Sequence, residues 1–313
     1  MKFRRALVSF VAVTVLYVGA LVWLDARNDV FANLPKVLDA LPVLAGITLL
    51  SYLLRYLRWY WLLQRAGHYL PWTSGFAAYV SGSAFTATPG KVGELVRIRY
   101  FLPMKVPPSR VIAAFVYERG FDLITVLLLS TALIKQSHLF ITVLSFVLIL
   151  LSVVITVARR PHWLGKLAAH LRLHGFRRLA GLSRVLRDGL SGCRIWMTGL
   201  DAVVSLLLGL LAWGAVAVSF LWLLSQLGIA IPALSGIAIY PLAMLAGAAS
   251  MLPGGVGSTE ITIIALLAVF DVPLELAALA AIAIRFSTLW FAVMGGFISV
   301  GVLELERQPR GAA

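Results

Sequence analysis

Two polar, glycine-rich segments of similar sequence interrupt long apolar runs, one in each half of the chain. The first is TPGKVGE at residues 88–94, and the second is LPGGVGSTE at residues 252–260. Both contain Pro-Gly-x-Val-Gly with a glutamate after it. Glycine permits backbone conformations that other residues disfavour, and a helix that starts after such a break offers backbone N–H groups to an anion. The two segments therefore predict a pair of anion-binding breaks.

An arginine follows each break, inside the apolar run that comes next. Arg119 lies 30 positions after Pro89, and Arg285 lies 32 positions after Pro253. A charge in the middle of a bilayer costs at least about 2.5–3.5 kcal/mol on insertion scales, so a retained arginine usually has a function or an ionic partner. Its planar, bidentate guanidinium suits a phosphate group. The arginines therefore predict either a phosphate site or ion pairs that hold helices together.

The candidate substrate-binding residues are those of the two breaks and the charged residues of the helices that follow. In the first half they are Pro89, Gly90, Lys91, Gly93, Glu94, Glu118, Arg119 and Asp122. In the second half they are Pro253, Gly254, Gly255, Gly257, Glu260 and Arg285. The ion-pair alternative would use Glu94, Glu118 or Glu260, and these glutamates could instead cap helix starts. No catalytic residue, metal ligand or cofactor is predicted, because the sequence holds no HExxH, no GxxxxGK[ST] and no nucleophile–base pair.

Composition sets the fold class of the elements that position these residues. Of the 313 residues, 61% are hydrophobic and 13% charged, with a mean hydropathy of +0.94, well outside the range of globular domains. The apolar runs have the length of spanning helices, about 17–25 residues, rather than of barrel strands. The net charge of +14 lies mostly in loops, where it indicates membrane topology and lipid headgroups rather than nucleic acid. We therefore expect an all-α polytopic membrane protein.

Charge and hydropathy divide the chain into four parts. We expect an N-terminal spanning helix and outer loop over 1–36, a first membrane repeat over 37–158, a basic amphipathic cytoplasmic segment over 159–198, and a second repeat with a tail over 199–313. The basic segment holds nine Lys or Arg residues against one acid, and its apolar spacing predicts two amphipathic helices with a break at Gly175. We expect the protein to lie in a bacterial plasma (inner) membrane, with both termini on the cytoplasmic side.

The two glycine-rich segments are predicted to be re-entrant hairpins that enter from opposite faces. A span from about Val37 to Leu54 is expected to deliver the next arginines to the cytoplasm, with tryptophans at the interface; these residues are Arg55, Arg58, Arg65, Trp59, Trp61 and Trp72. The first hairpin would enter from that side, and the second from outside, because the loop at residues 271–275 has no basic residue. Together with about six full spans this gives an inverted repeat, in which broken helices form a site at the midplane.

Four motifs resemble a known family. The segments TPGKVGE, YERGFD at 117–122, LPGGVGSTE and IRFSTLW at 284–290 are similar to the transmembrane region of the lysyl-phosphatidylglycerol synthase family, flippase-like membrane proteins, over about Leu38 to Val300. In bifunctional members, the resemblance implies, this region moves aminoacylated phosphatidylglycerol between leaflets, while a cytoplasmic domain performs aminoacyl transfer. The chain ends at Ala313, so we expect translocation without the aminoacyl chemistry.

Three functional hypotheses remain open at the level of sequence. The first is a flippase for an anionic lipid, either a phospholipid or a polyprenyl-phosphate-linked intermediate. The second is a non-catalytic membrane subunit that docks a lipid or glycan synthetic enzyme. The third is an intramembrane lipid-modifying enzyme with Glu94 or Glu260 as acid or base. The expected partners are an anionic membrane lipid and, as alternatives, a second copy of the chain or a synthetic enzyme.

Overall fold

The protein is helical throughout its described part, which confirms the predicted class. The computed structural model describes residues 34–133, 141, 145, 149 and 161–307, and these contain no β-strand. The expected helices at Ala6–Leu24 and Leu139–Val157 lie outside the described residues. In lipid an unpaired backbone polar group is costly, so a strongly apolar chain folds into helices that satisfy their own N–H and C=O groups.

Three described helices are long and apolar enough to cross a membrane. They are α2 (Leu34–Arg65), α9 (Gly199–Gln226) and the continuous helix Leu274–Arg307, which consists of α12 (Leu274–Arg285), the π-helical turn η8 (Phe286–Trp290) and α13 (Phe291–Arg307). A fourth long helix, α5 (Pro108–Ser130), has 23 residues and carries several charges in its interior. It ends in the short 3-10 turn η5 (Thr131–Leu133).

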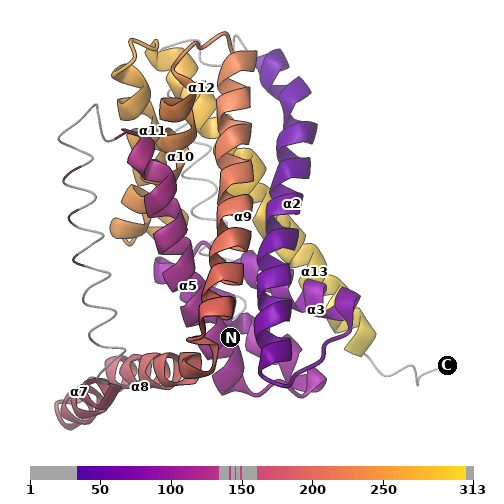
Figure 1. The fold of residues 1–313 in the computed structure, drawn as a ribbon, viewed down its shortest axis with the longest axis vertical. Helices are drawn as coiled ribbons and strands as arrows, with labels where there is room; N and C mark the ends of the chain where they lie inside the picture. The colour runs from indigo at the N-terminus through magenta and orange to yellow at the C-terminus, as the bar shows by residue number, and fades with distance from the viewer. Residues whose placement is uncertain (1–33, 134–140, 142–144, 146–148, 150–160, 308–313) are drawn as a thin grey trace.

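Each glycine-rich segment lies at the tip of a hairpin. The first hairpin consists of α3 (Trp72–Ser81), η2 (Gly82–Phe85), η3 (Pro89–Val96), α4 (Arg97–Phe101) and η4 (Leu102–Met104). The second consists of α10 (Ala233–Ala249), η7 (Pro253–Gly255) and α11 (Ser258–Ala268). The first starts where α2 ends, and the second starts at the opposite end, where α9 ends (Figure 1). The tips, η3 and η7, touch each other inside the molecule, so the two hairpins are inserted in opposite directions, as predicted.

Two helices lie across one end of the molecule, beside the starts of α5 and α9 (Figure 1). They are α7 (Pro161–Leu173) and α8 (Arg177–Gly192), with Gly175 between them at φ +81°. This is the predicted pair of helices. The turn η6 (Cys193–Trp196) then leads into α9, whose first N–H groups are capped by Thr198, since its hydroxyl accepts from the Asp201 N–H. We call this end the basic end and the opposite one the far end.

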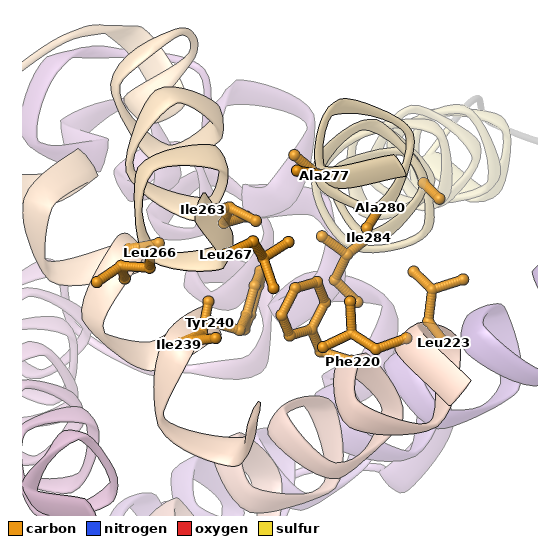
Figure 2. Packing of buried hydrophobic residues seen from close by; sticks show 14 of the residues in the cluster. Phe220, Leu223, Ile239, Tyr240, Ile263, Leu266, Leu267, Ala277, Ala280 and Ile284 are labelled. Atoms are coloured by element: carbon orange, nitrogen blue, oxygen red, sulfur yellow. The ribbon is translucent and has the colours of Figure 1, made fainter. Parts of the chain in front are cut away.

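The buried apolar residues form two separate cores, one around each hairpin. The core at the far end is built from α9, α10, α11 and α12, with Phe220, Tyr240, Leu267 and Ile284 interdigitating (Figure 2). The core at the basic end is built around α3, α4 and the first half of α5, with Trp59 and Trp196 fully buried in it. The tips of the hairpins and the charged residues of α2 and α5 lie between these two cores.

The structure corrects the expected end of the second span. Helix α2 continues past Leu54 to Arg65, so that Arg55 and Arg58 lie inside the helix instead of in a cytoplasmic loop. Trp59, expected at the interface, is fully buried, and the Arg58 side chain has no exposed surface. Only Arg65 reaches the end of the helix, where it pairs with Asp201 and remains half exposed.

Candidate functional site

An ion-paired group of seven residues surrounds the first break. Its cations come from α2, α4 and α5, and its carboxylates come from the break and α5. The members, which we call the charged cluster, are Arg55, Arg58, Glu94, Arg97, Glu118, Arg119 and Asp122. Except for Arg119, whose side chain is 24% exposed, and Arg55, at 11%, each side chain is at most 7% exposed. Sequence reasoning found four of the seven and missed Arg55, Arg58 and Arg97.

Arg58 holds two carboxylates of α5 at once. Its Nη2 lies 2.6 Å from Asp122 and 3.3 Å from Glu118, whose positions four residues apart place them on one face of the helix. Glu118 also accepts from the Tyr79 hydroxyl at 2.6 Å. The Arg58 Nε and Nη1 atoms are buried without a hydrogen-bond partner. Arg58 thus connects α2 to α5, and Glu118 connects α5 to Tyr79 of the first hairpin, while two polar atoms of Arg58 stay unsatisfied.

Glu94, the glutamate of the first break, is held by cations on both sides. It lies 3.1 Å from Arg97 and 3.5 Å from Arg119, and it accepts from the Thr86 hydroxyl at 2.8 Å. The Arg97 guanidinium also lies over the Tyr79 ring at 4.2 Å. Arg119 in turn reaches Glu118 at 3.0 Å. The predicted ion pairs of Arg119 are therefore present, and every carboxylate in the cluster is shared between several cations.

The second break is simpler. Arg285 Nε pairs with Glu260 at 3.0 Å, and its Nη2 donates to the Gly254 carbonyl at 2.6 Å. Gly254 and Gly255 both have positive φ, at 64° and 66°, a region that glycine adopts without strain. A Cβ on Gly254 would lie 3.6 Å from the Ala87 Cα of the first hairpin. That distance is an ordinary van der Waals contact, so the backbone conformation, rather than lack of space, favours glycine at this position.

Side chains already occupy some of the N–H groups expected to be free for an anion. The Gly257 N–H donates to Glu260 at 2.8 Å, and the Gly93 N–H donates to the Thr88 hydroxyl at 2.8 Å. The expectation of free donors is therefore wrong at these two positions. Glu260 caps α11 and pairs with Arg285 together, so both alternatives considered for it hold. Pro89 and Gly90 open η3, and Pro253 opens η7.

Lys91 has no ion pair with any described residue, in contrast to the arginines. Its backbone is in the left-handed region at φ 55°, unusual for a residue with a side chain. It lines two neighbouring cavities, whose walls share Lys91, Trp213 and Met244. A strained, unpaired lysine at the tip of the hairpin is therefore the cation of the site that is most available to a ligand.

The larger cavity, of about 380 Å³, lies between the two hairpin tips. Its wall is mostly apolar, from residues such as Leu123, Val126 and Leu245, and its charged lining residues are Lys91, Arg119 and Asp122. Gly254 and Gly255 of the second break line it too. The cavity is thus amphipathic, with an apolar wall and a predominantly cationic side, which is the polarity of an anionic lipid.

The smaller cavity, which we call the polar chamber, has a volume of about 70 Å³. It brings together Arg55 of α2, Lys91 of the first break and Arg285 of α12, with hydroxyls from both halves of the chain. No carboxylate lies among its described lining residues. Arg119 and Arg285, which have matching positions after the two breaks, therefore line different cavities, and Lys91 lines both.

The formal charges of the described residues in the site do not balance. With Lys91 and the Arg285–Glu260 pair added to the charged cluster, there are six cations, Arg55, Arg58, Lys91, Arg97, Arg119 and Arg285, and four carboxylates, Glu94, Glu118, Asp122 and Glu260. The formal excess is two positive charges. Buried charge without compensation is costly in a membrane, so this excess favours an anion as the ligand. Among the described residues, no group of His, Cys, Asp and Glu side chains is arranged to hold a metal ion.

Comparison with protein families agrees with the motifs at the two breaks. Residues 7–296 match the family described as the lysylphosphatidylglycerol synthase TM region. The chain belongs to this family. The match covers both hairpins and the charged residues of the site, and together with the apolar helices it identifies the chain as an integral membrane protein from a family of lipid-related proteins. Comparison with curated proteins and with solved structures found no match.

Proposed function

We propose that this protein moves an anionic lipid between the leaflets of the membrane. The observation that carries the proposal is the larger cavity, because its apolar wall and cationic side lie where two oppositely inserted hairpin tips meet. An anionic headgroup would approach Lys91 and Arg119, and an acyl or prenyl chain would lie along Leu123, Val126 and Leu245. Broken helices that meet inside an inverted repeat are the usual place for a transporter's substrate site.

Access to the cavity would alternate between the two faces by movement of the hairpins. The first hairpin is fixed at the basic end by Arg99 and Tyr100, which contact Glu304 near the end of α13 at 2.8 and 2.9 Å. The Arg99 and Glu304 side chains are exposed, and exposed ion pairs contribute little, about 0–1 kcal/mol. The Arg99–Glu304 ion pair can therefore open at small cost. In this proposal the protein is a transporter and has no enzymatic step, and the basic end faces the cytoplasm of a bacterial plasma membrane, as do both termini.

Blocking the cavity with a large side chain tests the proposal. Ala248 of α10 lines the larger cavity, and Ala248→Trp would fill part of it. Ala268, the last residue of α11, is exposed and does not line the cavity, so Ala268→Trp is a matched control. In proteoliposomes with fluorescent phosphatidylglycerol, we expect Ala248→Trp to slow transbilayer movement about tenfold or more, a barrier increase of ~1.4 kcal/mol.

The control variant and the headgroup give the outcomes that decide the test. Ala268→Trp should move the anionic lipid at the wild-type rate, and wild-type protein should move phosphatidylglycerol faster than phosphatidylcholine. Equal rates for the two lipids in wild-type protein would contradict an anionic substrate. An undiminished rate in folded Ala248→Trp protein would show that the lipid does not pass through this cavity.

A further inference from the structure

The polar chamber has properties that the larger cavity lacks. Three cations from three separate elements, Arg55, Lys91 and Arg285, line it, and none of its described lining residues is a carboxylate. The charge of Arg55 is partly compensated from outside the chamber by Asp122 at 3.2 Å, and that of Arg285 by Glu260 at 3.0 Å. Lys91 has no such partner among the described residues. The chamber is therefore a small cavity lined by hydroxyl groups and cations, and it should strongly prefer a negatively charged ligand.

The size of the chamber limits what can enter it. A cavity needs about 10–15 Å³ to hold one water molecule, so 70 Å³ has room for about five water-sized groups. This corresponds to the oxygens of one phosphate with little space beyond them. A sugar, glycerol or aminoacyl group bonded to that phosphate would extend beyond the volume of the chamber. The acyl or prenyl chain bonded to the same phosphate could lie in the larger cavity, which shares Lys91, Trp213 and Met244 with the chamber.

The charge of the site points to the same ligand. The six cations and four carboxylates around the two cavities leave a formal excess of two positive charges. A terminal phosphate carries about −1.5 to −2 at neutral pH, because its second pKa is near 6. A phosphodiester has no second ionisation, so it would leave part of the excess uncompensated. Since unbalanced charge is costly in this environment, a terminal phosphate matches the site better.

We propose that the polar chamber binds the terminal phosphate of a lipid phosphomonoester, and that Lys91 pairs with the second negative charge of this phosphate. The substrate class is then a lipid whose headgroup is the phosphate itself, on an acyl or a prenyl chain. This inference rests on the proposed function, since it names the substrate of the same site. It adds that lipids with a substituent beyond the phosphate are bound less tightly.

Binding measurements on purified protein in detergent test this assignment. The probes are short-chain phosphatidic acid and phosphatidylglycerol with the same acyl chains, with phosphatidylcholine as the zwitterionic reference. We expect phosphatidic acid to bind at least about tenfold more tightly than phosphatidylglycerol, which corresponds to ~1.4 kcal/mol. In Lys91→Gln this preference should fall to about threefold or less, because one charge-assisted contact to the phosphate is lost.

Two further variants separate the charge of Lys91 from its position in the fold. Lys105 also has a left-handed backbone, at φ 59°, but it is exposed and lines neither cavity, so Lys105→Gln should keep the wild-type preference. Lys91→Arg keeps the charge and should retain most of the preference. A loss of preference in Lys105→Gln as large as in Lys91→Gln would overturn the assignment.

The remaining outcomes distinguish this inference from the proposed function. Equal affinity for phosphatidic acid and phosphatidylglycerol in wild-type protein that still transports phosphatidylglycerol would overturn the inference and leave the proposed function standing. If neither lipid binds better than phosphatidylcholine, the proposed function fails as well. Inorganic phosphate is the third probe. If it binds as tightly as phosphatidic acid and depends on Lys91, the chamber is a site for free phosphate and the lipid assignment is overturned.

Discussion

The two breaks share a sequence pattern but differ in what holds them. The first lies in a cluster of four arginines and three carboxylates, in which each carboxylate contacts two or more cations. Among the described residues, the ion pair at the second break is Arg285–Glu260, and three glycines there have positive φ. The first tip is thus fixed by side-chain charge and the second by backbone conformation.

This difference indicates that the two halves of an inverted repeat divide the chemistry of the site unequally. The first half supplies five of the six cations of the site, including Lys91, and the second half supplies Arg285 and three glycines with positive φ. Changes in the first half should therefore affect charge and ligand binding through many contacts. Substitutions in the second half should have local effects that a second substitution at the partner residue can reverse.

The largest effect is expected from Arg58, the most deeply buried cation of the cluster. Arg58→Met leaves Glu118 and Asp122 short of a partner in the protein interior, and we expect a loss of about 3–5 kcal/mol in the free energy of unfolding. Arg65→Met is the control on the same helix, and should cost less than about 1 kcal/mol because Arg65 is half exposed. Unfolding in mixed micelles measures both, and equal losses would contradict the assigned role of Arg58.

A double substitution at the second break tests whether its ion pair is self-contained. Arg285→Met leaves Glu260 buried without its cation and should cost about 3 kcal/mol, whereas Arg285→Met with Glu260→Gln should regain most of this loss. The same design at the first break, Arg119→Met with Glu94→Gln, should show no such rescue. Arg119→Met alone should cost less than Arg58→Met, about 1–2 kcal/mol, because the Arg119 side chain is 24% exposed whereas that of Arg58 has no exposed surface.

In a double-mutant cycle, strong coupling at Arg285–Glu260 and weak coupling at Arg119–Glu94 would sharpen the contrast between the breaks. Strong coupling at both would show that the two tips are held in the same way, and the contrast drawn above would then be wrong.

Alanine substitutions of the glycines at the second break should destabilise the protein to different extents, depending on the atoms around each glycine. Gly255→Ala places a Cβ 2.8 Å from the Thr259 hydroxyl oxygen and 3.1 Å from the Gly247 Cα, in addition to the cost of a left-handed residue. Gly257→Ala has only the conformational cost of its backbone, at φ 86° and ψ −57°, because nothing lies within 4 Å of its Cβ position. We expect Gly255→Ala to be the more destabilising of the two in thermal unfolding. A smaller loss for Gly255→Ala would mean that the tip relaxes around the methyl group.

Labelling of single cysteines should leave stability unchanged and report the opposite insertion of the hairpins. Tyr69 precedes the first hairpin at the basic end, Leu274 follows the second at the far end, and both are exposed. The native Cys193 should stay silent, because burial raises the pKa of its thiol to about 12. A charged maleimide added to intact vesicles should therefore label Tyr69→Cys and Leu274→Cys from opposite sides. Labelling of both from one side would rule out the inverted arrangement.

The sequence was sufficient to predict the class, the hairpins and several helix positions, because each depends on local signals. Hydropathy marks α9 and the last helix, and Pro-Gly pairs mark the tips. The last helix was expected at about Leu274 to Leu303 and runs from Leu274 to Arg307. Gly175 separates α7 from α8 as its type suggests. These features follow from the cost of unpaired backbone in lipid and from residue-specific backbone preferences.

The sequence did not reveal the cations of α2, because their environment depends on residues far along the chain. Arg55 and Arg58 follow a span of sufficient length, and in that context the positive-inside rule places them in a loop. Their burial becomes favourable only through Glu118 and Asp122, more than 60 positions later in the case of Asp122. The apolar and aromatic residues from Trp59 to Leu63 were the available signal, since they continue the helix beyond both arginines. Which carboxylate would accept which arginine could not be read from a single sequence.

The π-helical turn at Phe286–Trp290 has a mechanical consequence. Before it, α12 packs against α11 of the second hairpin; after it, α13 packs against α3 and η2 of the first, with Gly296 directly beneath the Ala84 backbone. One continuous helix therefore packs against both hairpins, and its two parts, α12 and α13, are joined by the turn that begins next to Arg285. A π-helical turn departs from the regular α-helical hydrogen-bond ladder and is often found at functional positions. A displacement of either hairpin must be transmitted to the other through this continuous helix or be absorbed in the five residues of the π-helical turn. The turn is therefore the point about which the two halves of the helix would move relative to each other.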